Sequence, residues 1–348
     1  MNIQNFKKFL ILLERKGYLL IGPQKREGLI LINRLKAKEF DIKVLSKQPF
    51  YSFKKFFIPS EEDLFKFSKN KTTVIADRQP KAIIGLSILD LKALNLWRQV
   101  FEKDFYFQER LKNVLLIGYG PAPEEEGQFR VWQPKYEEDF LEHVQFDIFL
   151  MRRGNKFQIF TGSRAAQKLL DELNYENYQH IQFTGIIKEE GVEPLIKEVR
   201  EKLRKMRPTD PLWQELGKKC IECGKCAIVC PTCFCFDLFD KTRIDAENKT
   251  QINTDSQRKS ASSQRQSAFV RERCWGNCFY PEFSEIAGGY KFLKTTAEKI
   301  YYWYYHKFVR IPDEFSIPGC VGCGRCTKVC PVGIDISKVL ERIKKAKN

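Results

Sequence analysis

Two segments of this chain read Cys220-Ile-Glu-Cys223-Gly-Lys-Cys226-Ala-Ile-Val-Cys230-Pro231 and Cys320-Val-Gly-Cys323-Gly-Arg-Cys326-Thr-Lys-Val-Cys330-Pro331. They share seven of twelve positions, and both have the spacing C-x2-C-x2-C-x3-C-P. Three cysteines on such a loop can reach three iron corners of one cubane, and glycine relieves crowding where the backbone wraps around it. The repeat therefore predicts two [4Fe-4S] clusters.

The fourth cysteine of each motif is expected to bind the cluster of the other motif. It lies about one turn into the following helix and points away from its own loop, as in two-cluster ferredoxins. The expected ligand sets are Cys220, Cys223, Cys226 and Cys330 for the first cluster, and Cys320, Cys323, Cys326 and Cys230 for the second. Structural zinc is the alternative, but zinc favours separate C-x2-C pairs and does not need a third cysteine three residues on.

Four cysteines lie outside the two motifs, namely Cys233, Cys235, Cys274 and Cys278. Four thiolates are a complete ligand set for one more metal centre, so a third iron-sulfur cluster is one interpretation. The alternative is that these cysteines pack as small apolar side chains, or form hydrogen bonds to the sulfur atoms of the two clusters. The residues alone leave both alternatives open.

The first 219 residues contain no cysteine, and their pattern is that of an α/β domain. Short apolar runs near turn residues predict strands at residues 72–76, 82–85, 114–118, 146–151 and 157–161. Apolar residues at three-and-four spacing predict helices at residues 89–101, 137–143 and 165–173. Because strands and helices alternate, we expect an N-terminal α/β domain and assign the whole chain to the α+β class.

A domain boundary is expected near residue 207. A charged helix over residues 192–206 precedes Pro208 and Pro211, which disfavour its continuation. The chain then divides into an α/β docking domain, residues 1–207, and an α-helical ferredoxin-like domain with two clusters, residues 208–348. Residues 240–267 have few apolar groups and predict a flexible insertion. Gly288-Gly289 predicts a turn before an aromatic-rich helix that packs as core.

Composition limits the class of protein. The chain has 348 residues, with 60 Lys and Arg against 44 Asp and Glu, and a formal charge of +16. This charge raises the alternative of a metal-stabilised nucleic-acid-binding protein, but no nucleic-acid motif accompanies it, so we expect no nucleic-acid partner. A signal peptide and a run of about 18 uncharged apolar residues are both missing from the sequence. We therefore expect a cytoplasmic protein without membrane contact, in a reducing compartment where cysteines favour metal binding.

No set of catalytic residues is evident in the sequence. His143, His180 and His306 lack the spacing of a zinc or acid-base site, and we expect them to be structural. No G-x-G-x-x-G opens a helix, so a nicotinamide or flavin site is not expected. The chain is predicted to move electrons, while bonds are made and broken elsewhere.

The sequence resembles the iron-sulfur beta subunit of cytoplasmic sulfhydrogenases and the related A subunit of anaerobic sulfite reductase. The motifs that carry the resemblance are CPTCFCF at residues 230–236, W-x2-C at 275–278, AGG at 287–289, HKF at 306–308 and CVGCGRC-x3-CP at 320–331. Looser matches are KKFFIPSEEDLF at 54–65, IIG followed by Asp90-Leu91, and DFYFQER at 104–110.

The resemblance implies a relay subunit of an anaerobic [NiFe] hydrogenase. Its partners would be a flavin- and NAD(P)-binding subunit and the hydrogenase small and large subunits. A sulfite or polysulfide reductase as the terminal enzyme is the alternative. The chain departs from the family at Leu89 and at residues 118–130, where relatives carry cysteines, and at Cys274, where the family residue is usually basic. A cluster held at the first two positions in relatives would be absent here.

Overall fold

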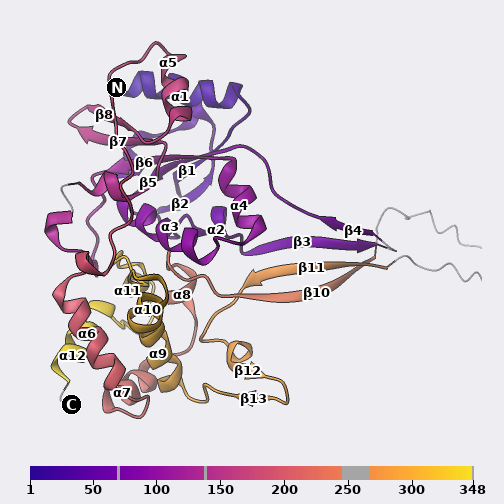
Figure 1. Ribbon diagram of the computed structural model, residues 1–348, viewed down its shortest axis with the longest axis vertical. Coiled ribbons are helices and arrows are strands. Elements are labelled where there is room, and N and C mark those ends of the chain that lie inside the picture. The colour runs from indigo at the N-terminus through magenta and orange to yellow at the C-terminus, as the bar shows by residue number, and fades with distance from the viewer. Residues whose placement is uncertain (69–70, 137–138, 245–266, 347–348) are drawn as a thin grey trace, which may run out of the picture.

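The computed structural model describes residues 1–68, 71–136, 139–244 and 267–346, and it contains both helices and strands in two stacked halves (Figure 1). The upper half is built on a seven-stranded sheet of order β2-β1-β5-β6-β7-β8-β9. Its strands are β1 (Leu19–Arg26), β2 (Leu29–Arg34), β5 (Lys81–Leu86), β6 (Val114–Gly120), β7 (Ile148–Arg153), β8 (Lys156–Thr161) and β9 (Tyr178–His180).

The centre of this sheet is parallel, because β1, β5, β6 and β7 run in one direction. The outer pairs β1–β2 and β7–β8 are antiparallel, and β9 lies parallel to β8. Four of the predicted strands are confirmed here, at β5, β6, β7 and β8. β5 and β6 are almost continuously buried because helices cover both faces of the sheet, whereas burial alternates along β8 near the sheet edge.

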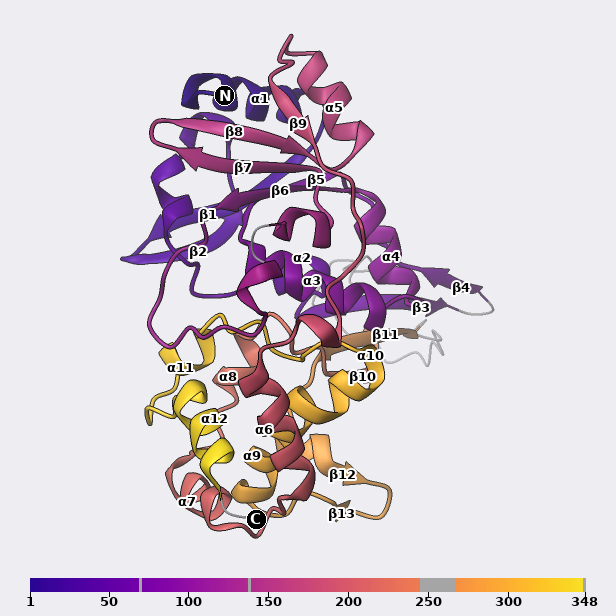
Figure 2. The same cartoon turned by 60° about the vertical axis from the view of Figure 1, so that its left-hand side comes forward.

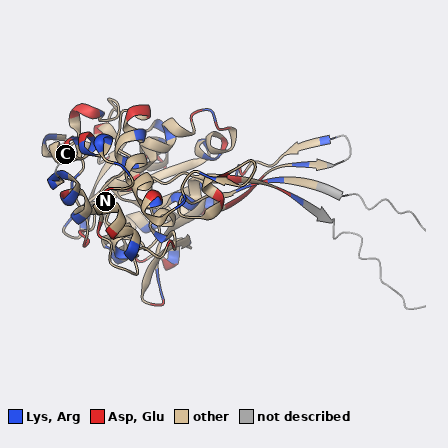
Figure 3. Cartoon of the chain, turned by 90° about the horizontal axis from the view of Figure 1, so that it is seen from below, with Lys and Arg blue, Asp and Glu red and all other residues tan. Residues whose placement is uncertain are grey.

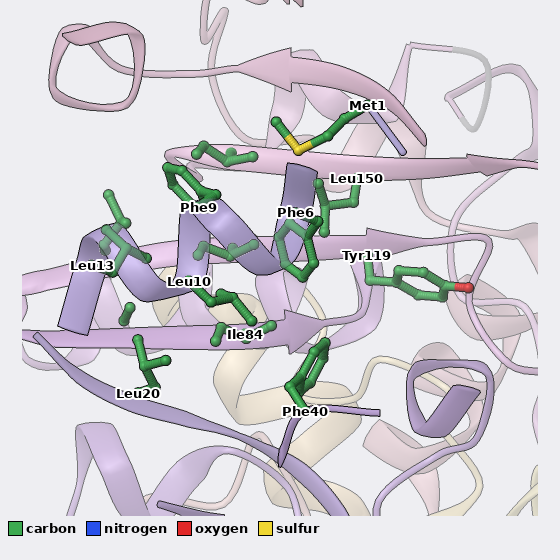
Figure 4. Packing of buried hydrophobic residues seen from close by; sticks show 14 of the residues in the cluster. Met1, Phe6, Phe9, Leu10, Leu13, Leu20, Phe40, Ile84, Tyr119 and Leu150 are labelled. Atoms are coloured by element: carbon green, nitrogen blue, oxygen red, sulfur yellow. The ribbon is translucent and has the colours of Figure 1, made fainter. Parts of the chain in front are cut away.

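Helices cover both faces of the sheet. On one face, α1 packs Phe6, Phe9, Leu10 and Leu13 against the sheet, and Figure 4 shows these side chains beside Ile84 and Leu150. The opposite face packs against α3, whose Ser87 and Asp90 form a capping box. The helices of this half are α1 (Ile3–Arg15), α2 (Lys54–Phe57), α3 (Ile88–Val100), α4 (Phe105–Lys112) and α5 (Arg164–Asp171).

One predicted helix is wrong. Residues 139–143 of the expected helix 137–143 contain only the 3-10 turn η4 (Phe140–His143), in which Leu141 is the buried residue. A segment this short with one buried side chain does not offset the cost of helix nucleation. Other 3-10 turns are η1 (Ala37–Glu39), η2 (Ile42–Ser46), η3 (Pro134–Tyr136), η5 (Glu189–Gly191) and η7 (Pro281–Ser284).

The lower half is helical and has its own hydrophobic core (Figure 2). Trp213 is fully buried there, with its ring 5.5 Å from that of Tyr304. Helix α6, which lies before the expected boundary near residue 207, packs Ile196, Val199 and Leu203 into this lower core. The elements are α6 (Pro194–Lys205), α7 (Pro211–Lys219), α8 (Lys225–Ile228), α9 (Thr296–Tyr305), the π-helical segment η8 (His306–Arg310), α10 (Ile311–Phe315), α11 (Arg325–Lys328) and α12 (Ile336–Lys345).

The two halves also share a sheet. Strands β3 (Glu61–Ser68) and β4 (Lys71–Val74) from the first half join β10 (Phe236–Ile244) and β11 (Ser267–Trp275) from the second in the order β10-β11-β3-β4. This sheet projects from the body in Figure 3. The expected flexible insertion, residues 240–267, therefore begins and ends in paired strands, and its residues 245–266 lie outside the described part of the chain.

Two further sequence features have a clear structural outcome. Gly288 and Gly289 have positive φ and join β12 (Glu285–Ile286) to β13 (Tyr290–Lys291), which confirms the predicted turn. Lys and Arg are spread over many elements and interspersed with Asp and Glu (Figure 3).

In the part of the chain that the structure describes, no helix has the length and apolar character needed to cross a membrane.

Candidate metal centres

The two cysteine motifs fold into loops of the same shape. Glu222 and Gly322 occupy equivalent positions, with φ of 53° and 69°. Gly224 and Gly324, one step past the second cysteine, have φ of 67° and 72° and precede the short helices α8 and α11. Such left-handed positions favour glycine because a side chain is strained there. The internal repeat of the sequence is therefore also a repeat of backbone conformation.

Backbone amides of these loops point at the cysteine sulfurs. The amide of Glu222 donates to Cys220 Sγ at 3.4 Å, and that of Gly322 donates to Cys320 Sγ at the same distance. The amide of Ile334 donates to Cys330 Sγ at 3.3 Å. Amide donors stabilise negative charge on sulfur, so the loops are suited to thiolate ligands rather than to neutral thiols.

The first predicted ligand set lies around one partly open cavity. Its lining includes all four cysteines of the set and Cys326, together with apolar side chains such as Ile300 and Trp303. All four are partly exposed, with Cys330 reaching the cavity from the second motif. Burial raises the pKa of Cys220, and the nearby Cys330 and Cys223 raise it further. The structure thus places Cys330 and Cys326 of the second motif at the cavity of the first motif.

The second predicted ligand set is deeper in the protein. Cys230, Cys320 and Cys323 are buried, and Cys326 is partly exposed. Burial raises the pKa of Cys320 to about 12, opposed by Lys307 and reinforced by Cys230. Burial also raises the pKa of Cys326, with further contributions from Cys320, Cys323 and Cys230. Cys230 therefore lies among the cysteines of the second motif.

The eight motif cysteines supply the type of ligand that iron-sulfur clusters use. Within the described residues, no three His, Cys, Asp or Glu side chains converge closely enough to hold one metal ion. Thiolates around a cubane lie farther apart than those around one zinc ion, because each binds a different iron. Raised thiol pKa values mean that metal binding must displace protons, which couples loading to pH. The assignment of individual ligands remains a prediction.

Three of the four remaining cysteines, Cys233, Cys235 and Cys278, lie near Lys307, and Cys274 lies apart from them. Cys233 lies beside Cys230, and their hydrogen bond lowers the pKa of Cys230. Burial raises the pKa of Cys278 to about 12, with Cys235 as the next contribution. Cys274 instead donates to Glu272 at 2.8 Å on β11, and burial with this bond raises its pKa to about 11. A third centre with all four as ligands remains a prediction, and Cys274 is its outlying member.

Comparison with known proteins finds a match over the segment that contains the cysteine motifs. Residues 219–264 and 254–334 match the 4Fe-4S dicluster domain family. Over 302 residues the chain is 26% identical to Sulfhydrogenase 2 subunit beta of Pyrococcus furiosus. The aligned region covers 84% of this chain and 82% of that protein. The chain resembles a sulfhydrogenase beta subunit. The resemblance inferred from the motifs is thereby confirmed, and no solved structure matches.

In this sulfhydrogenase-like chain, the N-terminal half covers the second cysteine loop. Gln48 Nε2 donates to the carbonyl of Cys323 at 3.0 Å, and the amide of Phe129 donates to the carbonyl of Gly322 at 3.1 Å. A Cβ on Gly322 would lie 2.0 Å from the Phe129 carbonyl oxygen. Residues 118–130 thus include a segment in direct contact with the loop.

A buried ion pair joins the same loop to helix α3. Arg325, between Cys323 and Cys326, has its guanidinium 3.3 Å from the Asp90 carboxylate, and both side chains are almost fully buried. Its Nε donates to the carbonyl of Pro49 at 3.2 Å. The sequence analysis named Asp90 only through the family resemblance. Its pairing with Arg325 could not be predicted from local sequence, because the two residues are 235 positions apart.

Two buried lysines, which sequence reasoning missed, lie near the sulfurs. Lys307 Nζ donates to Cys230 Sγ at 3.2 Å. Burial lowers its pKa, but Cys230, Cys233 and Cys320 together hold the pKa of Lys307 well above its ordinary value. The Lys54 Nζ, from α2, lies 3.8 Å from the centre of the Trp275 ring. Burial lowers the pKa of Lys54, although Cys233, Cys230 and Cys235 act to raise it. The sequence signals were the placement of Lys307 in the HKF motif and of Lys54 at the start of KKFFIPSEEDLF.

The histidines have other neighbours. His143 Nδ1 lies 2.9 Å from the Gly185 carbonyl oxygen, and His180 Nδ1 lies 3.2 Å from Thr161 Oγ1. His306 stacks on Tyr302 with ring centroids 5.7 Å apart. Burial lowers the pKa of His306 to about 4, with Lys307 and Arg310 adding to the effect. The structure therefore places the three histidines separately.

Proposed function

We propose that this chain is the iron-sulfur electron-transfer subunit of a soluble, cytoplasmic, multisubunit [NiFe] hydrogenase of the sulfhydrogenase type. In this role it relays electrons between a flavin- and NAD(P)-binding subunit and the hydrogenase subunits. The observation that supports the proposal most is the placement of two motif cysteines: Cys330 lines the cavity beside the first motif, and Cys230 lies close to Cys320 and Cys326 of the second motif. The resemblance to a sulfhydrogenase beta subunit supports the choice of complex.

The chemistry supplied by the bound group is one-electron transfer by two [4Fe-4S] clusters. The protein holds the thiolates, donates backbone amides to their sulfurs and surrounds the first set with apolar side chains such as Ile300 and Trp303. All four cysteines of the first set are partly exposed, whereas three of the four in the second set are buried and the N-terminal half contacts their loop, so we assign exchange with a partner to the first. The N-terminal half is proposed to act also as a docking platform.

The test is anaerobic purification of the chain with its partners. The expected preparation is brown, contains about eight irons per chain, or about twelve with a third cluster, and gives electron paramagnetic resonance signals on reduction. Mass spectrometry of the copurifying subunits separates a hydrogenase from a sulfite or polysulfide reductase. Zinc in place of iron would overturn the proposal.

A pair of variants tests the crossed ligand sets. Cys330→Ser is expected to remove the signal of the cluster whose other ligands begin at Cys220, while the matched Cys274→Ser leaves both signals, because Cys274 lies beside Glu272. Iron content and reduced-cluster spectra of both variants are compared with those of the unaltered chain. Loss confined to the cluster on Cys320 in the Cys330 variant would refute the crossing.

A further inference from the structure

The ammonium group of Lys307 lies in an unusual place for a lysine. It is fully enclosed, and its three donors are matched by three acceptors: Cys230 Sγ at 3.2 Å, Thr232 Oγ1 at 3.1 Å and the Gly319 carbonyl at 3.1 Å. The Trp303 ring lies 5.1 Å from Nζ. Burying a cation lowers the stability of the fold unless a negative group lies beside it.

The two predicted clusters differ in whether a buried lysine contacts one of their ligand sulfurs. The sulfurs of the first set receive backbone amides from Glu222 and Ile334. The buried Lys299 donates to the Glu222 carboxylate of that loop at 2.5 Å, so its charge is compensated within the loop. Lys307 makes its contact on the sulfur of Cys230 itself. The two loops have the same backbone shape, so buried cations at the sulfurs distinguish the second set. Arg325 interacts with Cys323 but is paired with the Asp90 carboxylate, whereas Lys307 on Cys230 has no carboxylate among its three acceptors.

We propose that Lys307 is a positioning residue that raises the reduction potential of the cluster bound by Cys230 above that of the cluster bound by Cys220. This inference rests on the proposed function, because it requires both clusters. A reduced [4Fe-4S] cluster carries one more negative charge than the oxidised cluster. A fixed cation at a ligand sulfur, in a site of low dielectric, therefore stabilises the reduced state more.

The location of Lys307 supports this role. It lies in the π-helical segment η8, directly after α9. Short π-helical segments are frequent at functional sites, because the extra residue re-aims a side chain. The carbonyl of Lys307 also accepts from the amide of Gly319, the residue before Cys320, at 2.8 Å. Lys307 thus contacts Cys230 through its side chain and the start of the second motif through its backbone.

The experiment is a redox titration of the full iron-loaded chain, followed by electron paramagnetic resonance with dithionite and mediator dyes. The variants are Lys307→Met, Lys307→Gln and Lys307→Arg, with Lys299→Met as the matched control from α9. Two one-electron steps are expected in the unaltered chain. The neutral variants should lower the upper step so that, at a fixed potential, the ratio of reduced to oxidised cluster falls about tenfold, which is 59 mV for one electron.

Lys307→Arg should keep the potential of the upper step close to that of the unaltered chain. Lys299→Met should change the ratio of reduced to oxidised cluster at the upper step by less than about threefold. Full iron content with an unmoved upper step in both neutral variants would overturn the inference while leaving the proposed function intact. Loss of the second cluster in both neutral variants, with the arginine variant loaded, would also overturn it and assign Lys307 a purely structural role. An unaltered chain without iron would instead reject the proposed function.

Discussion

Replacing Arg325 by Met should uncouple the second cysteine loop from the N-terminal half. The guanidinium is the cationic partner of Asp90, and their side chains are 2% and 3% exposed. Removing one partner of a buried ion pair leaves an uncompensated charge and costs about 3–5 kcal/mol. Asp90 keeps its hydrogen bonds from the Ser87 amide and hydroxyl, so we expect the lower end, about 3 kcal/mol.

The assay is urea unfolding of the iron-loaded chain under anaerobic conditions, followed by tryptophan fluorescence and by visible absorbance of the clusters. The matched control is Arg342→Met, whose pair with Glu215 is 43% and 47% exposed and should change the free energy of unfolding by less than about 1 kcal/mol. The double variant Asp90→Asn with Arg325→Met should recover about 1 kcal/mol or more, because neighbouring sites are not additive. Equal effects of the Arg325 and Arg342 variants would refute the reasoning.

Three further outcomes are expected. Gly322→Ala should lower the free energy of unfolding by about 1–3 kcal/mol more than Gly333→Ala. The two glycines have nearly the same φ, 69° and 68°, but only a Cβ at position 322 would collide with the Phe129 carbonyl oxygen. Equal urea midpoints for the two variants would contradict this prediction. Because the pKa of His306 falls from 6.5 to about 4 on folding, the unfolded chain binds the extra proton between those values. Stability should therefore drop by about 1 kcal/mol more between pH 7.5 and 5.5 in the unaltered chain than in His306→Gln, and an identical drop would exclude the effect. Chelation of iron should remove much of the circular dichroism of the lower helices, whereas the seven-stranded sheet, with its own cores, should stay folded; full retention of helix would argue against clusters as folding elements.

Local patterns predicted most of the regular structure. The apolar runs at residues 82–85 and 114–118 correspond to β5 and β6, and the periodicity at 89–101 corresponds to α3. Residues 137–143 had the same periodicity without enough buried side chains, and only a short turn formed. The strand at residues 72–76 was also expected, as β4, but not its place in a sheet with β10 and β11. Pairing between distant strands depends on both partners, which periodicity in one segment does not describe.

The spacing of the motif cysteines, by itself, predicted ligands for two clusters, because the reach of a short loop depends only on neighbours in the chain. The match to a 4Fe-4S dicluster domain covers the same motifs. Tertiary structure alone decided which charged groups surround those sulfurs. Lys307 and Arg325 appear in the sequence as ordinary basic residues, and they become buried only when segments such as that containing Gln48 pack on the loop containing Cys323. The electrostatic environment of a cluster follows from which atoms lie close in space, and contacts across hundreds of residues set that environment.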